Sequence, residues 1–343
     1  MAKMAPISNQ AAWIPAKSRP LEVGPGPEPD PSEDEVVIQV AYAAVNPTDH
    51  MMQDQPYFEL QYPFIFGTDV AGTVVQLGSG VTRFQLGQRV IGHCDSLLTR
   101  KATNAGFQLY TTCREILVSA VPDSLPLANA AVLPLSVSTA ASALFHQLEL
   151  PFPLLAPKHT GKTVLIWGGS SSVGSSAIQL ALAAGFDVAT TAGSSNHEYV
   201  KNLGATHVFD HKEPGVVEKI SKVLKPGDVV FDCISSPSTQ VACGKILESI
   251  GGGKLPVVLL PREPFPDNVQ GVFVNGLAPG MFALNVGDAV WCKYIPQALA
   301  SGKFQAKPDP EVIEGGLEKV QTGIDLLRQG VSAKKVVVEI SKE

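Results

Sequence analysis

The sequence has few cysteines, and they are too scattered to form a metal or disulfide motif. Five cysteines are spread over 343 residues, with no C-x-x-C pair among them. An odd number at irregular spacing excludes a disulfide scaffold and a zinc ribbon. We therefore expect a reducing compartment, the cytoplasm, in which each thiol is a small buried apolar side chain. These residues are Cys94, Cys113, Cys233, Cys243 and Cys292.

Charge and long apolar runs are scarce as well. Charged residues make up 17% of the chain and the formal net charge is -6, so the basic surface that binds nucleic acid or an anionic membrane is missing. Residues 1–13 lack the basic and apolar regions of a signal peptide. We find no apolar run that approaches a membrane span. The sequence thus predicts neither a nucleic acid nor a membrane as partner.

Apolar residues are abundant, at 45% of the chain, which is enough for two packed domains. Short strands between glycine turns in the first 120 residues predict a β-barrel-like module. From Thr163 onward strands and helices alternate, as in a doubly wound parallel sheet of the Rossmann type. We predict an α/β protein with a β-barrel domain over 1–125 and 300–343, and a dinucleotide-binding domain over 126–299. Pro134 is expected to break the helical stretch 127–148.

The most informative stretch is 163–185. The apolar run 164–167 predicts a buried strand, the segment 168–174 reads Gly-Gly-Ser-Ser-Ser-Val-Gly, and a helical pattern follows from Ser172. A strand, a tight turn and a helix aim backbone N–H groups and a helix dipole at one point, where a pyrophosphate is stabilised. Ser171 and Ser172 could also donate to its oxygens. The alternative is a tight turn without a ligand.

The end of the second strand of this domain favours one cofactor over another. An acidic residue there binds the ribose of NADH, and its absence leaves room for the 2′-phosphate of NADPH. The strand 187–191 runs into 192–196 without an acid, so we predict NADPH. Ser194, Ser195 and Asn196 would then donate to the phosphate, or they simply cap the following helix. Lys201 or His211 could add positive charge.

Six motifs along the chain form a specific set. They are Asn46-Pro-Thr-Asp49, Gly67-Thr-Asp-Val-Ala-Gly-Thr-Val74, Gly87-Gln-Arg-Val90, Gly168–Gly174, Leu203-Gly-Ala-Thr-His-Val-Phe-Asp210 and Phe231-Asp-Cys233. In this order they resemble the medium-chain dehydrogenase/reductase superfamily, whose barrel domain is GroES-like. With the segments 138–140 and 275–282 included, the chain is most similar to the zinc-independent quinone oxidoreductase branch, and within it to trans-acting enoyl reductases that work beside fungal polyketide synthases.

Zinc alcohol dehydrogenases of the same superfamily are the competing family. Their catalytic metal needs a cysteine after the first long strand and a His-Glu pair in the next segment, where this chain has Asn46-Pro47 and Gly67-Thr68-Asp69. Their second zinc needs four close cysteines, which Cys94 and Cys113 cannot supply. Without a Lewis acid, alcohol oxidation loses its main driving group. We predict no metal, and reduction of an activated C=C bond instead.

The resemblance also implies roles for individual residues. Thr139 would lie near the nicotinamide or substrate and donate a hydrogen bond, although its hydroxyl could equally bond a carbonyl of the preceding helical turn. Beside the nicotinamide end we expect Thr48, Asp49, His50 and Met51. The pyrophosphate would be bound by Ser171, Ser172, Val173 and Gly174, the 2′-phosphate by 194–196, and the nicotinamide lined by Leu259 and Val337. The substrate cavity would be shaped by Leu277, Ala278, Pro279, Gly280 and Met281.

One position departs from the family pattern. Fungal enoyl reductases that the chain resembles carry a lysine where Met51 stands, and related quinone reductases often carry a tyrosine. Methionine can neither donate a proton nor bind a phosphate. His50 titrates near neutrality and could replace the missing donor, or it is a surface or packing residue, in which case water protonates the product.

We therefore predict an NADPH-dependent enoyl reductase of fungal secondary metabolism. Its substrate would be a small α,β-unsaturated carbonyl compound or an acyl chain tethered to a carrier protein, and a polyketide synthase would be its partner. Two alternatives remain open. One is an NADPH quinone reductase. The other is a regulator or scaffold that binds NADPH without catalysis, which Met51 in place of a donor would explain.

Overall fold

The computed structural model describes residues 8–56, 58–262 and 264–342, so residues 1–7 of the segment considered for a signal peptide lie outside it. The chain forms two compact units. Unit 1 contains residues 1–135 and 309–343, and unit 2 contains residues 136–308. The two boundaries between the units, after residues 135 and 308, lie further along the chain than the predicted domain boundaries after residues 125 and 299. Each unit is described by itself.

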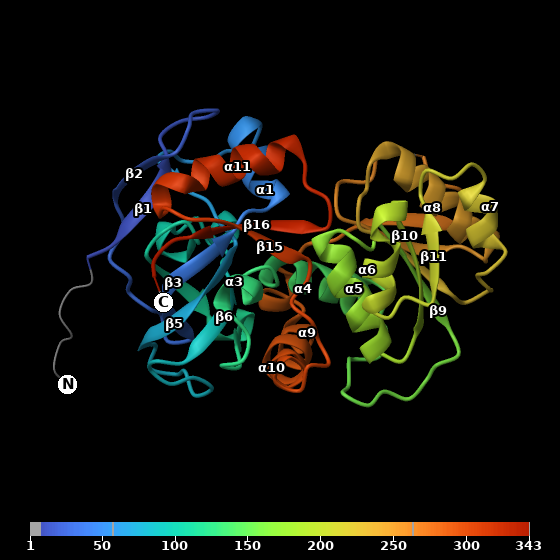
Figure 1. Cartoon of the computed structure of the whole chain (residues 1–343), viewed down its shortest axis with the longest axis horizontal. Helices are drawn as coiled ribbons and strands as arrows, with labels where there is room; N and C mark the ends of the chain where they lie inside the picture. Colours follow the sequence, from blue (N-terminus) through green and yellow to red (C-terminus); the bar gives the residue numbers. More distant parts are fainter. Residues whose placement is uncertain (1–7, 57, 263, 343) are drawn as a thin grey trace. The chain divides into compact units, whose positions relative to one another are not determined.

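Unit 1 is built mainly on antiparallel strands, as expected for a GroES-like barrel, and β15 and β16 pair in parallel (Figure 1). Its larger sheet has the order β15-β16-β3-β5-β6-β8, with β7 also paired to β3, and a smaller sheet has the order β2-β1-β4. The strands are β1 Gln10–Ile14, β2 Glu22–Pro25, β3 Glu35–Ala44, β4 Phe64–Ile65, β5 Asp69–Leu77, β6 Arg89–His93, β7 Tyr110–Arg114, β8 Val118–Ala120, β15 Asp309–Ile313 and β16 Lys334–Glu339. The helices are α1 Pro47–Asp54, α2 Ser96–Thr99, α3 Leu127–Ala130 and α11 Val320–Gln329.

Strand β3 lies at the centre of unit 1 because nearly all of its side chains are apolar. It pairs with β5, β7 and β16, and its residues Val36, Ile38 and Val40 are fully buried. Two C-terminal elements complete this core: Ile324 of α11 and Val338 of β16 belong to the same hydrophobic cluster. The predicted return of the C-terminal helix and strand to the first module is therefore confirmed.

Unit 2 is a parallel sheet with the order β11-β10-β9-β12-β13-β14, which confirms the predicted Rossmann architecture. Leu165 and Val230 share a hydrophobic core with α7 and α8, whereas α5 packs against β9 and β10 (Figure 1). The strands are β9 Thr163–Trp167, β10 Asp187–Ala192, β11 His207–Asp210, β12 Val229–Asp232, β13 Gly253–Val257 and β14 Val269–Phe273. The helices are α5 Ser172–Ala183, α6 His197–Asn202, α7 Val216–Ser221, α8 Pro237–Ser249, α9 Leu284–Gly287 and α10 Ile295–Ala300, with π-helical turns at Ser142–Gln147 and Asp288–Tyr294.

One segment corrects our expectation that no apolar run approaches a membrane span. Within the described residues, Leu127–Gln147 is long and apolar enough, with 21 residues and a mean hydropathy of 1.5. Of its most apolar window, 83% is buried inside the protein, as is common for core helices, so it is weak evidence for a span. Pro134 divides the segment as predicted: α3 ends at Ala130, and α4 (Pro134–Ala141) begins at the proline.

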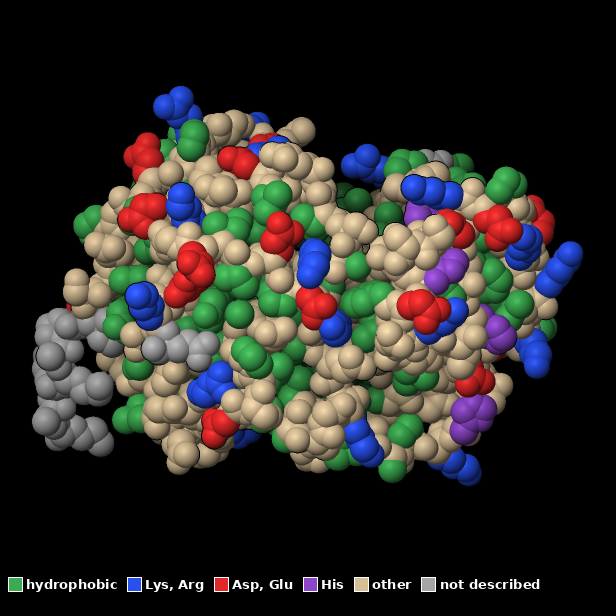
Figure 2. Space-filling view, in the orientation of Figure 1, with side chains coloured by type: hydrophobic (Ala, Val, Ile, Leu, Met, Phe, Trp, Pro, Cys, Tyr) green, Lys and Arg blue, Asp and Glu red, His purple; other side chains and the backbone are tan. Residues whose placement is uncertain are grey.

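Four of the five cysteines are buried and Cys292 is partly exposed, and all five thiols are free. This agrees with their predicted role as small apolar side chains. On the face shown in Figure 2, acidic and basic side chains are interspersed over the described residues.

Candidate functional site

The glycine turn between β9 and α5 closes tightly because two serine contacts fold it onto itself. Ser171 is the N-cap of α5, and its Oγ accepts a hydrogen bond from the Gly174 N–H at 3.0 Å. The same hydroxyl donates to the Gly168 carbonyl at 2.8 Å. Its proton is thus already used within the turn, so it is less available to a phosphate than the sequence suggested. The Ser172 and Val173 N–H groups occupy the first turn of α5, where a helix offers them no acceptor.

Glycine is required in this turn because neighbouring atoms leave no room for a side chain. A Cβ atom on Gly169 would lie 2.1 Å from Thr190 Oγ1, and one on Gly174 would lie 2.2 Å from the Gly168 carbonyl oxygen. Gly168 also has a φ of 86°, which side chains disfavour. The result is a bare backbone cradle at the positive end of a 12-residue helix. Such a cradle fits a pyrophosphate.

The predicted 2′-phosphate residues follow β10 directly. Ser194 and Ser195 are exposed and Asn196 is half-buried, and the Asn196 side chain makes no capping hydrogen bond to α6. The His211 ring lies beside Gly193, with Cε1 3.7 Å from where a Cβ would stand. These residues therefore form one surface at the end of β10.

Asp210 also belongs to this surface, and the sequence interpretation missed it. It ends β11, and pairing of the parallel strands places it next to Ala192. Hydrogen bonds from the backbone of Lys212 and Ser194, together with nearby His211, lower the pKa of its carboxyl. A carboxylate thus stands close to the predicted 2′-phosphate site. The signal in the sequence was an acid at the end of the third strand rather than the second.

In unit 1, α1 carries four predicted residues, of which Asp49 is buried and the other three are partly exposed. Asp49 Oδ2 accepts from the Asn46 N–H at 2.8 Å, and Oδ1 accepts from the Gly67 N–H at 3.2 Å. Burial nevertheless raises the pKa of Asp49 to about 7. Its carboxyl therefore holds the start of α1 in place, and Thr48, His50 and Met51 remain closer to solvent.

His50 differs from the proton donor that the sequence suggested. Burial lowers its pKa, with Arg328 adding to this effect and Asp54 opposing it. Its Nδ1 lies 3.9 Å from Asp54 Oδ2, one helical turn further on. The imidazole is consequently neutral at pH 7, and it can donate one N–H but rarely delivers a proton as an imidazolium.

Four buried side chains form a closed ring at the start of α1, which we call the buried polar ring. Its members are Asn46, Thr68, Asp69 and Lys335. Lys335 Nζ contacts Asn46 Oδ1 and lies 3.3 Å from Asp69 Oδ2. Asn46 Nδ2 donates to Thr68 Oγ1 at 2.9 Å, and Thr68 Oγ1 donates to Asp69 Oδ1 at 3.3 Å. All four residues are at most 4% exposed. The only signal of the ring in the sequence is a lysine that directly precedes the apolar run 336–338 of the predicted strand 335–340.

Asn46, Thr68 and Asp69 of the buried polar ring lie in the two segments that would be expected to hold metal ligands if the chain were a zinc alcohol dehydrogenase. Asn46 and Thr68 offer one neutral oxygen each, and the Lys335 ammonium already contacts the oxygens of Asn46 and Asp69. A fixed cation in contact with two candidate ligands opposes a second cation. Over the whole described chain, no three His, Cys, Asp or Glu side chains are grouped to hold a metal ion. These residues do not fit a catalytic zinc.

Thr139 lies in α4 and is 7% exposed. Its hydroxyl makes no hydrogen bond to any residue in the described part of the chain, so the alternative role as a partner of the preceding turn is not seen. Two neighbours fix the helix: Ser136 Oγ lies 2.9 Å from Ser176 Oγ of α5, and Ser138 Oγ accepts from Trp291 Nε1 at 2.9 Å. Thr139 is thus held near the helix that begins at the glycine turn.

The remaining predicted residues divide into buried and partly exposed ones. Val337 is fully buried in β16 opposite Ala44, which leaves only its backbone for ligand contacts. Leu259 follows β13 and is partly exposed. In the segment 277–281, Ala278, Pro279 and Gly280 are buried, whereas Leu277 and Met281 are partly exposed and better able to line a cavity.

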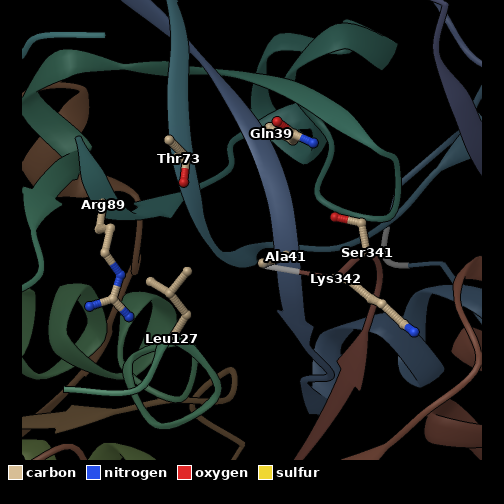
Figure 3. A pocket seen from close by; sticks show the side chains of 7 residues that line it. All are labelled: Gln39, Ala41, Thr73, Arg89, Leu127, Ser341 and Lys342. Carbon is tan, nitrogen blue, oxygen red and sulfur yellow. The ribbon is translucent and has the colours of Figure 1, made fainter. Parts of the chain in front are cut away.

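Two cavities within the units contain none of the predicted site residues. One, of about 260 Å³, opens on the larger sheet of unit 1. In Figure 3 the Arg89 guanidinium and the Lys342 ammonium lie on opposite sides of it and point apart, so they do not converge on a ligand. The other, of about 280 Å³, lies in unit 2 beside Lys254.

Comparisons with known proteins agree with this geometry. The family described as "Alcohol dehydrogenase GroES-like domain" matches residues 32–123, and "Zinc-binding dehydrogenase" matches residues 172–278. Trans-enoyl reductase himH of Aspergillus japonicus is 69% identical over 99% of both chains. Dehydrogenase orsE of Emericella nidulans is 40% identical over 97% of this chain and 99% of its own. The crystal structure of CurK enoyl reductase superposes with a TM-score of 0.77 over 97% of this chain and 99% of its own, at 21% identity.

Proposed function

Because the chain belongs to the medium-chain dehydrogenase/reductase family, we propose that it is an NADPH-dependent enoyl reductase of fungal secondary metabolism. Its substrate is an activated C=C bond, in an acyl chain tethered to a carrier protein or in a small α,β-unsaturated carbonyl compound. Its partner is a polyketide synthase, on which it acts in trans, and its compartment is the cytoplasm. The observation that carries this proposal is the 69% identity to a trans-enoyl reductase along 99% of the chain.

The glycine turn supports a dinucleotide as cofactor. Gly168, Gly169 and Gly174 leave the backbone bare, and the N–H groups of Ser172 and Val173 are available for a pyrophosphate. Ser171 contributes by fixing the turn. When bound, a reduced nicotinamide supplies the hydride for the β-carbon of the double bond.

NADPH rather than NADH is favoured by the hydroxyls after β10. Ser194, Ser195 and Asn196 present donors at the end of a strand that carries no acid, and His211 adds an imidazole. Asp210 opposes this preference, because its carboxylate repels a phosphate. We propose that the donors outweigh the single carboxylate, which already accepts hydrogen bonds from the backbone N–H groups of Lys212 and Ser194.

At the reacting end, Thr139 and His50 provide donors from the chain itself. The Thr139 hydroxyl is unengaged among the described residues and can donate to the substrate carbonyl, where negative charge develops during reduction. A neutral His50 can donate its N–H in the same way. Since Met51 offers no proton, we propose that water protonates the α-carbon. The chemistry of Asn46, Thr68 and Lys335 supports a reaction without zinc.

The test is to incubate the protein with NADPH and a crotonyl-type thioester and to follow the loss of cofactor absorbance. Turnover of thioesters supports the proposal, with the Thr139→Val variant reduced about a hundredfold if its hydroxyl stabilises developing charge. Turnover of small quinones without thioesters would instead identify a quinone reductase. Tight NADPH binding without transfer to any acceptor would identify a regulator, and a gain of activity in Met51→Lys would then show which group was lost.

A further inference from the structure

The buried polar ring touches the first residues of both helices that carry predicted nicotinamide-end residues. Asn46 is the N-cap of α1, and its N–H donates to Asp49. Asp69 Oδ1 accepts from the N–H of Leu135, the second residue of α4, at 2.8 Å. The ring therefore joins the start of the helix that carries Thr48, His50 and Met51 to the start of the helix that carries Thr139.

Lys335 is the only cation among the four residues of the ring. Its ammonium contacts Asn46 and pairs with Asp69 at 3.3 Å, while the Asp49 carboxyl lies close enough to interact with both Asp69 and Lys335. Buried carboxylates at this density are tolerated only when a cation and hydrogen bonds compensate them. Lys335 is 4% exposed and Asp69 is fully buried, so water cannot take over that role.

The three contributions to the ring come from distant parts of the chain. Asn46 follows β3, Thr68 directly precedes β5 and Asp69 is its first residue, and Lys335 lies in β16, 289 residues from Asn46. Burying four polar side chains is costly unless every group is satisfied. The ring compensates most of these groups by hydrogen bonds, and Asp69 Oδ2, which accepts no hydrogen bond from the described part of the chain, is compensated by the Lys335 ammonium at 3.3 Å. These contacts fix the directions of the Asn46 and Asp69 side chains.

We propose that Lys335 is a positioning residue: through the buried polar ring it fixes the start of α1 within unit 1, and thereby Thr48, His50 and Met51, the residues of α1 that are proposed to receive the nicotinamide end of the cofactor. The inference rests on the proposed function for the identity of the cofactor, but its effect on α1 is a property of the protein alone.

The sharpest test uses Thr68, which lies in the ring but carries no charge. Thr68→Val keeps the shape of the side chain and removes the hydroxyl, which breaks the link from Asn46 to Asp69. Thr68→Ser keeps the hydroxyl. We expect Thr68→Val to accelerate amide hydrogen exchange in α1 and to raise the dissociation constant for NADPH, each by about fivefold or more, as for the loss of one buried hydrogen bond. Thr68→Ser should restore both quantities, and α8 should exchange as in the wild type in either variant.

A second variant tests the ion pair itself. Lys335→Met combined with Asp69→Asn removes both charges and retains an oxygen for the Leu135 N–H. Faster exchange in α1 and weaker NADPH binding are expected, with a rise in KM for NADPH larger than the fall in kcat. The matched control is Arg114→Met with Asp95→Asn, which removes another ion pair of unit 1, 2.6 Å long, in which Asp95 is buried and Arg114 is partly exposed. This control variant should change the melting temperature of the protein. It should change neither the amide hydrogen exchange of α1 nor the affinity for NADPH.

Wild-type exchange in α1 and wild-type affinity for NADPH in Thr68→Val would overturn the inference. So would equal effects of Thr68→Val and Thr68→Ser, or of the control pair. If the wild-type protein binds NADPH but reduces no enoyl compound, the proposed function fails, while exchange and affinity still decide the role of Lys335. If the wild-type protein binds no NADPH, the amide hydrogen exchange of α1 alone decides whether Lys335 is a positioning residue.

Discussion

Single residues in unit 1 show how burial redirects ordinary side-chain chemistry. Asp49 is a carboxylic acid with a pKa of about 7, and His93 is a histidine with a pKa of about 4. In both cases burial is the largest cause, with Asp69 and Lys335 acting on each group. Both residues lie near the buried polar ring, so their protonation is coupled to the stability of unit 1.

The two shifts predict opposite pH dependences. Between pH 4 and 7 the folded protein binds a proton at Asp49 that the unfolded chain has released, so this group's contribution to stability is lost as pH rises. His93 acts in the reverse direction, because between pH 4 and 6.5 the unfolded chain binds the proton. The two contributions largely cancel in the wild type.

Asp49→Asn should expose the His93 contribution. We expect the free energy of unfolding of this variant to rise between pH 4 and 6.5, whereas that of the wild type changes little. The difference between the two proteins should shift by roughly 4 kcal/mol between pH 4 and 7, the linkage value of a shift of about three pKa units. Urea unfolding at a series of pH values measures it. A difference that is independent of pH would contradict the assignment.

At the scale of elements, the turn between β9 and α5 combines two tasks that the sequence did not separate. Ser171 fixes the turn by capping α5, while the N–H groups of Ser172 and Val173 lie in the first turn of that helix and are predicted to bind the ligand. A serine-rich loop looks uniform in the sequence, but its hydroxyls differ in function once the chain bends. Ser175 is likewise used internally, because its Oγ donates to the Ser171 carbonyl at 2.8 Å.

Ser171→Ala should therefore destabilise the fold as well as the site. Loss of the cap leaves the Gly174 N–H without its acceptor, whereas the Gly168 carbonyl keeps only the Ser171 N–H as donor, at a cost of about 1 kcal/mol in the free energy of unfolding. Ser172→Ala is the matched control for stability, because its side chain caps nothing, and it should unfold like the wild type. Denaturant unfolding of the two variants measures this. Equal stabilities would show that the cap is unimportant.

At the scale of the whole molecule, a bound dinucleotide should stabilise the folded chain by mass action. At a free concentration of about one hundred times its dissociation constant, NADPH should add about 2.7 kcal/mol to the free energy of unfolding. We expect a larger rise in melting temperature with NADPH than with NADH at equal concentration. Treatment with a chelator should leave melting unchanged. Calorimetry measures all three, and an equal or larger shift with NADH would contradict the preference for the 2′-phosphate.

The sequence by itself determined the architecture, because its signals are local. Glycine turns, buried strands and the helix break at Pro134 depend on neighbouring residues, so the alternation of strands and helices from β9 to β13 and the tight turn after β9 were legible and are confirmed. Phosphate binding at that turn stays a prediction. Strand β14 was missed, since Gly271 and polar neighbours weaken its pattern. The motifs that resemble the medium-chain dehydrogenase/reductase family likewise identified it correctly.

Only the tertiary structure decided which side chains share an environment. Asp210 contacts the backbone of Ser194 because β10 and β11 pair in parallel. Lys335 contacts Asn46 although the two residues are 289 positions apart in the sequence. Burial then sets the protonation of Asp49 and His50, which composition and spacing do not reveal. The physical reason is that electrostatic and hydrogen-bond energies depend on distance and solvent exposure in space, whereas a sequence shows only separation along the chain.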